Sequence, residues 1–201
     1  MAKNEWLKAF KNADNEAIKR LLEENEAVLS LEAASMNGGH YSGLVLKALN
    51  LENTEWDACI FDNVEFIDCN LTGALFNAST MFAVKFESCQ LSDASFDGCV
   101  MQRSSLANIS DSEGLELTDC QLKECTLENI DFADARLHAL SFTSGRIARV
   151  SGEAELSGIV LRGVEVEAFD TSEMQVLRCT ASGMSEVPEG FILYDGRRKR
   201  V

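Results

Sequence analysis

The chain has 201 residues, of which 46% are hydrophobic, and it carries a formal net charge of −15 at pH 7. This size and apolar content suit one domain with a continuous core, and the negative charge argues against direct binding to nucleic acids or to a membrane surface. No run of about 18 apolar residues occurs that would span a bilayer, and the polar start of the chain is unlike a secretory signal. We therefore expect a cytoplasmic protein, with export that needs no conventional signal peptide as the alternative.

The first 43 residues, 1–43, predict a helical N-terminal cap followed by a linker. Asn4 is expected to cap a first short helix, and Asp14 or Asn15 a second one. The apolar side chains that recur at helical spacing are Trp6, Leu7, Phe10, Ala17, Ile18, Leu21 and Leu22. The stretch Ser35–Gly43 contains two adjacent glycines and is interpreted as a flexible joint between the cap and the rest of the chain.

From Leu46 onward, every fifth residue is large and apolar. The series is Leu46, Leu51, Trp56, Phe61, Phe66, Leu71, Phe76, Met81, Phe86, Leu91, Phe96, Met101 and Leu106. It slips by one residue around Ile109–Glu116, resumes at Leu117, and returns weakly after a second irregular stretch, Ala148–Glu155. Neither an α-helix nor a flat strand keeps positions five apart on one face. The spacing instead predicts a backbone that turns a corner every five residues and closes a square coil of about 20 residues.

A second inward position lies two residues before each of these centres. It holds small or medium side chains, namely Cys59, Val64, Cys69, Ala74, Ser79, Val84, Cys89, Ala94, Cys99 and Ser104. Polar residues lie between the inward positions and just after each centre, as expected for walls that face water. Residues 44–181 are therefore predicted to form stacked square coils, close to seven in number and about 30 Å long at about 4.8 Å per coil.

Three segments, Cys69–Gly73, Ala94–Gly98 and Ile130–Asp134, match the motif A-(D/N)-L-x-x. The chain thereby resembles the pentapeptide-repeat proteins over roughly residues 44–179. The resemblance implies an all-β fold, a right-handed quadrilateral parallel β-helix, here with a short N-terminal α-helical cap. It implies no particular function, because fold and function are separate inferences.

The last 20 residues, 182–201, are predicted to form a C-terminal cap and a basic tail. The end of a β-helix exposes a strand edge that promotes aggregation unless it is covered. We expect this cover to be formed by Phe191, Ile192, Leu193 and Tyr194. The run Arg197–Arg200 is interpreted as a solvated basic tail.

The inward small-residue position also accounts for the cysteines, which are Cys59, Cys69, Cys89, Cys99, Cys120, Cys125 and Cys179. A buried free thiol behaves as a small hydrophobe. Their number is odd and no CxxC pair occurs, so we expect no zinc site. Cysteines stacked on neighbouring coils have parallel Cβ directions, which are poor for a disulfide. We therefore predict reduced thiols and a reducing compartment.

The sequence contains no recognisable catalytic, cofactor-binding or metal-binding motif. His40 in the linker and His138 on an outer wall both fit surface positions, and the many carboxylates lie on convex walls rather than in a cleft. Asp111–Gly114 lacks the remaining ligands of a calcium loop and is interpreted as the segment that absorbs the register slip. We expect no catalytic residue, no cofactor and no metal ion, hence a protein that is not an enzyme.

The outer walls carry two candidate binding surfaces. Because positions 20 apart lie above one another, Ile60, Phe82 and Val100 gather on one wall, with Leu75 on the wall before it. These four form a candidate partner surface, with cover by a loop or tail as the alternative. The second candidate is an acidic surface centred on the first coils, made of Glu52, Glu55, Asp57, Asp62, Glu65, Asp68 and Asp97.

Two functions suit such a rod. The first is a non-enzymatic protein–protein interaction module, a scaffold, adaptor or effector that presents its walls or its helical cap to another protein. The second follows from the resemblance, because some pentapeptide-repeat proteins protect type II topoisomerases such as gyrase from quinolones, by implication through DNA mimicry. Residues 46–180 contain 23 acidic and 9 basic residues, a charge density comparable in order with duplex DNA, which carries one charge per about 1.7 Å.

The end of the chain disfavours the second function. Members of the topoisomerase-protecting subgroup pair through an apolar C-terminal segment, whereas this chain ends in a basic run. We therefore rank the interaction module first and DNA mimicry, with a DNA-binding enzyme as partner, second. A homodimer is left open, and no direct contact with nucleic acid or membrane is expected.

Overall fold

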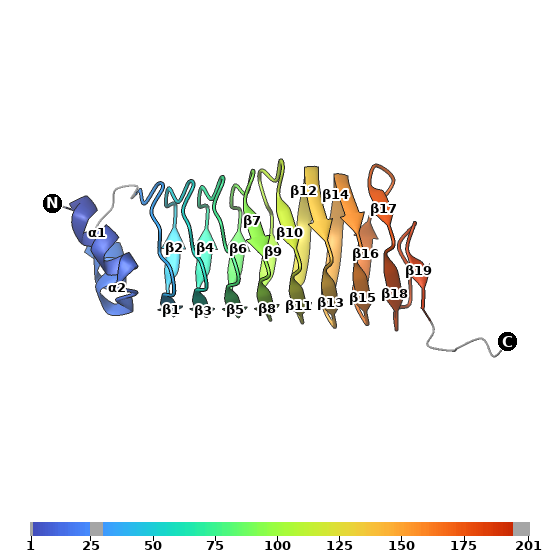
Figure 1. Cartoon of the computed structure of the whole chain (residues 1–201), viewed down its shortest axis with the longest axis horizontal. Coiled ribbons are helices and arrows are strands. Elements are labelled where there is room, and N and C mark those ends of the chain that lie inside the picture. The colour runs from blue at the N-terminus through green and yellow to red at the C-terminus, as the bar shows by residue number, and fades with distance from the viewer. Residues whose placement is uncertain (1, 25–29, 195–201) are drawn as a thin grey trace.

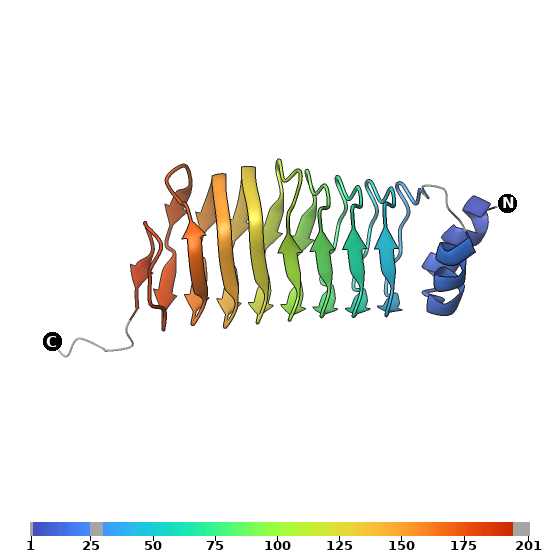
Figure 2. The same cartoon turned by 180° about the vertical axis from the view of Figure 1, so that it is seen from behind.

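The computed structural model describes residues 2–24 and 30–194, which form a rod with two helices at one end (Figure 1). The helices are α1 (Ala2–Lys11) and α2 (Asn15–Glu24). The strands follow one another along the rod in chain order, from β1 beside the helices to β19 at the far end, and the opposite view shows the same order (Figure 2). The fold is the predicted four-sided parallel β-helix.

Two of its four walls are regular sheets. Wall 1 consists of β1 (His40–Ser42), β3 (Ile60–Asp62), β5 (Thr80–Phe82), β8 (Val100–Gln102), β11 (Gln121–Lys123), β13 (Ser141–Thr143), β15 (Val160–Arg162), β18 (Thr180–Ser182) and β19 (Ile192–Leu193). Wall 2 consists of β2 (Val45–Lys47), β4 (Glu65–Ile67), β6 (Lys85–Glu87), β9 (Ser105–Ala107), the first parts of β12 (Thr126–His138) and β14 (Arg146–Ser157), and β16 (Glu165–Phe169). The seven strands of wall 2 confirm the predicted number of coils.

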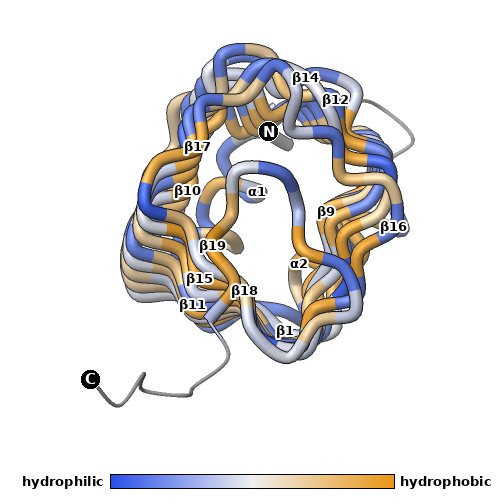
Figure 3. Tube along the Cα trace, turned by 90° about the vertical axis from the view of Figure 1, so that its right-hand side faces the viewer, coloured by the Kyte–Doolittle hydropathy of each residue, from blue (hydrophilic) through white to orange (hydrophobic). Residues whose placement is uncertain are grey.

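The other two walls complete each coil. Wall 4 contains β7 (Ser95–Asp97), β10 (Glu116–Thr118), the last parts of β12 and β14, and β17 (Gln175–Leu177). Wall 3 is held by single bridges, such as Asn50–Asn70 and Gln90–Asp111, and by the middle parts of β12 and β14. Seen along the rod, wall 3 lies at the top, wall 1 at the bottom, wall 2 at the right and wall 4 at the left (Figure 3).

Most corners are made by a residue in the left-handed backbone conformation instead of by proline. Asn53, Asp93 and Arg103 have φ values of 55°, 54° and 53° at such corners. This conformation costs an L-residue roughly 1–2 kcal/mol, and the corner amides compensate with hydrogen bonds to the next coil, as when Asn53 N donates to Thr72 O at 2.8 Å. A chain with this many turns therefore needs only one proline.

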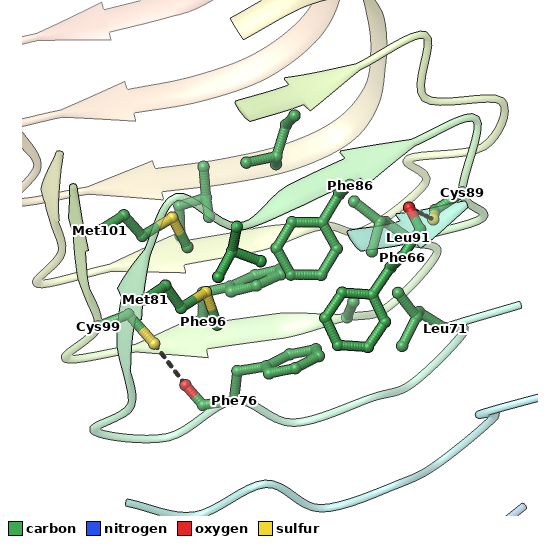
Figure 4. Close-up of a cluster of buried hydrophobic side chains, with 14 of the residues drawn as sticks. Phe66, Leu71, Phe76, Met81, Phe86, Cys89, Leu91, Phe96, Cys99 and Met101 are labelled. Atoms are coloured by element: carbon green, nitrogen blue, oxygen red, sulfur yellow. Dashed lines mark hydrogen bonds between the residues drawn. The ribbon is translucent and has the colours of Figure 1, made fainter. Parts of the chain in front are cut away.

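The predicted centres point inward and form one core that runs along the axis. Phe66 stacks on Phe86 with ring centroids 4.9 Å apart, and Phe76 stacks on Phe96 at 4.8 Å (Figure 4). Rings of the two stacks meet edge to face, with Phe76 and Phe86 at 5.7 Å and 83°. Both geometries are favourable for aromatic pairs, so the five-residue series is the main source of packing in the first half of the rod.

The second inward position also has a hydrogen-bonding role that its small size does not reveal. Cys99 Sγ donates to Phe76 O at 2.6 Å, and Cys89 Sγ donates to Phe66 O at 3.4 Å (Figure 4). Ser79 Oγ makes the same bond to Trp56 O, at 2.6 Å. In each case the carbonyl belongs to a centre residue of the preceding coil. Thiols and hydroxyls are therefore small donors that link successive coils.

All seven cysteines are buried and free, which confirms their predicted inward position. Burial raises the pKa of the thiols of Cys59, Cys125 and Cys179. A thiol that is both buried and harder to ionise is a poor nucleophile. These three cysteines therefore serve packing and hydrogen bonding rather than chemistry.

Both irregular stretches lie where they were predicted. In the first, Ser110 N donates to Cys89 O while Leu91 N donates to Asp111 O, so one extra residue is accommodated in this coil. In the second, the pairing of β12 with β14 shifts between Phe132 and Ala135, and that coil is one residue shorter. Residues stacked on adjacent coils are consequently 19, 20 or 21 positions apart.

The β-helix begins earlier than predicted. Ser30 bridges to Asn50, and Gly38 N donates to Asp57 O at 2.8 Å. The stretch Ser35–Gly43 is thus part of the first coil and not a flexible joint, and His40 lies in β1 and not in a linker. The signal was present in the sequence, because the inward residues Leu31, Met36 and Tyr41 continue the five-residue series towards the N-terminus.

The helix caps agree with the sequence analysis in part. Asp14 caps α2, since its Oδ1 accepts a hydrogen bond from Ala17 N at 3.0 Å. The expected cap at Asn4 is wrong, because α1 already begins at Ala2 and includes Asn4 in its first turn. Neither helix has the length or the hydropathy needed to cross a bilayer, as far as the described part of the chain extends.

The helices are fixed to the first coil by polar and aromatic contacts. Asn15 Nδ2 donates to His40 O at 2.9 Å, and Asn15 Oδ1 accepts from Ser42 N at 3.1 Å. Tyr41 OH donates to Phe10 O at 2.8 Å in the buried contact between the cap and the coil. The two bonds of Asn15 satisfy backbone groups of β1 that would otherwise be exposed at the end of the rod.

The far end of the rod is closed differently from the prediction. Phe191 is buried and meets Phe169 edge to face at 6.3 Å. The expected cover by Ile192, Leu193 and Tyr194 is wrong, because β19 adds an edge strand to wall 1 and all three side chains are exposed. The predicted basic tail at 197–200 lies outside the described residues.

Candidate interaction surfaces

Wall 1 carries the three apolar side chains expected to gather on one wall. Ile60, Phe82 and Val100 are 48%, 39% and 42% exposed. Ile60 and Val100 belong to one outward column, separated by Thr80, and Phe82 belongs to the parallel column two residues further along the strand. The guanidinium of Arg103 lies 5.6 Å from the centre of the Phe82 ring, a cation–π contact that leaves the ring accessible.

Leu75 does not join this surface. It lies on wall 4 and is half-buried between its bridge partners Glu55 and Ser95. Of the four predicted residues, Ile60, Phe82 and Val100 therefore share wall 1, and we call these three residues the apolar patch.

Wall 1 has almost no net charge. Along its strands and the corner that follows them, the charged side chains are Asp62, Arg103, Lys123, Glu124 and Arg162. Arg103 Nε lies 2.9 Å from Glu124 Oε2, and this arginine lowers the pKa of Glu124. Each of the other three walls has more acidic than basic side chains. The apolar patch therefore lies on the wall that is least costly to bring against another protein surface.

The predicted acidic surface is not one surface in the structure. Glu55, Asp57 and Asp97 lie on wall 4, whereas Glu52 lies on wall 3 and Asp62 on wall 1. The remaining two, Glu65 and Asp68, lie on wall 2 and at the corner after it, and Glu65 Oε1 pairs with Lys85 Nζ at 2.8 Å. These seven residues encircle the first coils instead of facing one partner.

The acidic face that the structure does form is wall 3 with the corner that follows it. All of its ionisable side chains are acidic, and no lysine, arginine or histidine lies among its described residues. They are Glu32, Glu52, Asp93, Asp111, Glu113, Asp131, Asp134, Glu153, Asp170 and Glu173. We call these ten residues the acidic wall. Seven of them, from Asp111 onward, lie on the last four coils of this wall.

The acidic wall is also free of compensating charge. None of its ten carboxylates forms a salt bridge with a described residue, whereas Arg146 on wall 2 bridges Glu128 and Glu167. Its carboxylates accept local hydrogen bonds instead. Asp170 Oδ1 accepts from Ser172 N at 2.9 Å, which lowers the Asp170 pKa. The formal charge of this face is therefore uncompensated, a property that becomes visible only when the residues are grouped by the coil positions at which they stack.

Little in the described residues suggests a reactive site. They contain no group of three or more His, Cys, Asp or Glu side chains placed to hold a metal ion. His138 points outward from wall 4, and His40 from wall 1. The cavity inside the last coils is lined only by apolar side chains, among them Phe142, Phe169 and Phe191, and its volume of about 20 Å³ is too small for a cofactor.

Comparison with known proteins identifies the repeat in this chain but does not identify a binding partner. The family model for the pentapeptide repeat region matches residues 45–114, and no curated protein matches the sequence. Similar solved structures include full-length QnrB1, a plasmid-mediated fluoroquinolone resistance protein, with 14% identity, 79% of this chain and 95% of that chain covered, and a TM-score of 0.39. HetL from Nostoc sp. strain PCC 7120, a pentapeptide repeat protein involved in heterocyst differentiation regulation, has 14% identity, coverages of 88% and 91%, and a TM-score of 0.37.

Proposed function

Because this chain contains a pentapeptide repeat region, we propose that it is a non-enzymatic interaction module that binds a protein partner through the apolar patch of wall 1. The observation that carries the proposal is the coincidence on one wall of exposed apolar side chains and near-zero net charge. The interior is filled, so only the outer walls and the two ends are available for binding. The seven buried free thiols support a role in a reducing compartment such as the cytoplasm.

The physical argument rests on desolvation. A partner that docks on a wall must strip water from it, and unpaired carboxylates make this costly. On wall 1 the contact would remove water from Ile60, Phe82 and Val100, which are already poorly hydrated. Aromatic side chains and arginine are the types that most often dominate binding energy, and the stacked pair of Phe82 and Arg103 provides both at the centre of the patch.

Replacing Phe82 with aspartate is expected to weaken partner binding at least about 30-fold, because it removes an apolar anchor and adds a charge to be desolvated. The matched control is Ala107→Asp, which adds the same charge at the equivalent position of wall 2. Full-length protein, wild type and both variants, would be used to capture partners from extracts of the source cells and to measure affinities. Equal binding by all three proteins would contradict a role for wall 1.

A second candidate function, DNA mimicry towards a type II topoisomerase such as gyrase, is favoured by the acidic wall. Its ten carboxylates extend over eight coils, about 34 Å at about 4.8 Å per coil. This is one negative charge per about 3.4 Å, the charge spacing along a single strand of duplex DNA. A basic DNA-binding groove would meet a face without basic side chains here, whereas walls 1 and 2 present mixed charges.

Neutralising the acidic wall separates the two functions. We expect the triple variant Asp111→Asn, Glu113→Gln, Asp131→Asn to lose inhibition of gyrase supercoiling at low salt, because charge attraction to a basic groove is lost. The matched control neutralises three carboxylates of wall 4, at Asp57, Asp97 and Glu155. Gyrase activity that is indifferent to the wild-type protein, or equal inhibition by both triple variants, would contradict mimicry through wall 3.

A further inference from the structure

We propose that wall 1 binds a second copy of this chain, face to face, with the two rods antiparallel. This inference rests on the proposed role of wall 1 as a binding surface and names its occupant. It follows from the distribution of charge over the four walls and from the order of side chains along the two outward columns of wall 1.

The charge of the chain restricts how two copies can meet. With a net charge of −15, two copies that met through walls 2, 3 or 4 would bring together faces with an excess of carboxylates, and like charges at an interface cost several kcal/mol. Wall 1 avoids this cost, because its five charged side chains include three basic ones. One of its columns, from Ile60 through Thr80 and Val100 to Val160, contains no Asp, Glu, Lys or Arg.

In the proposed dimer, the two copies are related by a twofold axis that runs parallel to the strands, midway between β8 and β11. The axis reverses the rod and leaves the strand direction unchanged, so each column of one copy lies over the same column of the other. Strand β3 then faces β15 of the partner, β5 faces β13, and β8 faces β11. Ile60 lies opposite the partner's Val160, and Asp62 lies opposite the partner's Arg162.

The charges on wall 1 are complementary in this register. Asp62 and Arg162 form no ion pair with any described residue of their own chain. Asp62 is therefore available to pair with the partner's Arg162, and by symmetry this ion pair forms twice in the dimer. At the corner, Arg103 lies near the partner's Glu124. An axis shifted to β8 would place Arg103 against the partner's Arg103, and one shifted to β11 would place Lys123 against the partner's Lys123. The register between β8 and β11 avoids both repulsions.

The arrangement with parallel rods is less favourable. Its twofold axis runs along the rod and places one outward column of wall 1 over the other. Ile60 would then face the partner's Asp62, and Val160 would face the partner's Arg162. Apolar groups would be buried against unpaired charges, which is costly. The antiparallel arrangement is therefore the one that the side chains support.

The area available implies a weak dimer. In this register eight strands, β1 to β18, face the partner, and at about 4.8 Å per strand and a wall width of about 13 Å they give about 500 Å² on each copy, near 1,000 Å² in total. Interfaces of this size lie at the low end for specific complexes. We therefore expect a dimer that forms at micromolar concentrations and dissociates on dilution.

Charge reversal tests the register directly. In sedimentation experiments on the full-length chain, wild type is expected to shift from monomer to dimer between about 1 and 100 µM. Asp62→Arg alone opposes two arginines, and Arg162→Asp alone opposes two aspartates, so each variant should dimerise at least about 10-fold more weakly. An equimolar mixture of the two variants should form a heterodimer of near wild-type affinity, because both opposite-charge pairs are then restored. A defect in folding cannot be rescued by mixing.

Several outcomes would overturn the inference. A wild-type chain that stays monomeric at 100 µM, single variants that dimerise as well as wild type, or a mixture that remains monomeric would each do so. The failure of this inference is separable from failure of the proposed function. If wild type is monomeric and Phe82→Asp still loses a captured partner that Ala107→Asp keeps, wall 1 binds a different protein and only the self-association is wrong.

Discussion

Replacing Phe76 with alanine is expected to lower the free energy of unfolding by about 3–5 kcal/mol. The Phe76 ring stacks on Phe96 at 4.8 Å and on Trp56 at 6.1 Å, and its edge meets Phe66 and Phe86. The side chain is fully buried. Its removal leaves a cavity that the rigid coils above and below cannot close. The protein then loses the free energy of burying the ring and also bears the cost of the empty cavity.

Urea unfolding followed by circular dichroism would measure this loss. The matched control is Phe82→Ala, which removes the same side chain from an exposed site on wall 1 and should change the free energy of unfolding by less than about 1 kcal/mol. Trp56 fluorescence gives a local readout, since its ring lies parallel to that of Phe76. Similar unfolding curves for the two alanine variants would mean that the five-residue series does not form the core.

The variant Gly152→Ala is expected to cost about 3 kcal/mol or more, or to prevent folding of the last coils. Gly152 has φ of +96°, which L-residues rarely adopt, and a Cβ at this position would lie 2.1 Å from Phe132 O and 2.7 Å from Phe132 N. The clashing atoms are backbone atoms of the neighbouring strand, which cannot rotate away. The register of β12 and β14 shifts at this point because the coil is one residue shorter. The backbone of Phe132 therefore lies so close to Gly152 that a side chain at position 152 has no room.

Gly98→Ala is the control for this prediction. Gly98 also has a positive φ, but it is a corner residue whose added Cβ would have its nearest neighbour at 3.9 Å, and alanine occupies the equivalent corner at Ala78. We expect a change within about 1 kcal/mol for this variant. Thermal melts of both variants would decide the matter, and a melting temperature for Gly152→Ala equal to that of Gly98→Ala would refute the close-approach argument.

The spacing of residues along the chain was enough to predict the core from Leu46 onward and the place of both irregular stretches. These properties depend on which residues lie five apart, and in a coil with one corner every five residues that spacing is a local property of the chain. The inward position of the seven cysteines followed for the same reason. The first coil was missed although Leu31, Met36 and Tyr41 continue the series, because the glycines of Ser35–Gly43 favoured a joint.

The tertiary structure alone decided which outer side chains share a face. Which residues stack depends on the pairing of successive coils, and the two irregular stretches change the offset between stacked residues from 20 to 21 and then to 19. The acidic wall is assembled across these changes, so a fixed offset of 20 cannot find it. The opposition of Asp62 and Arg162 in the proposed dimer also depends on the fold, because only the pairing of successive coils puts β3 and β15 on one wall, with four strands between them.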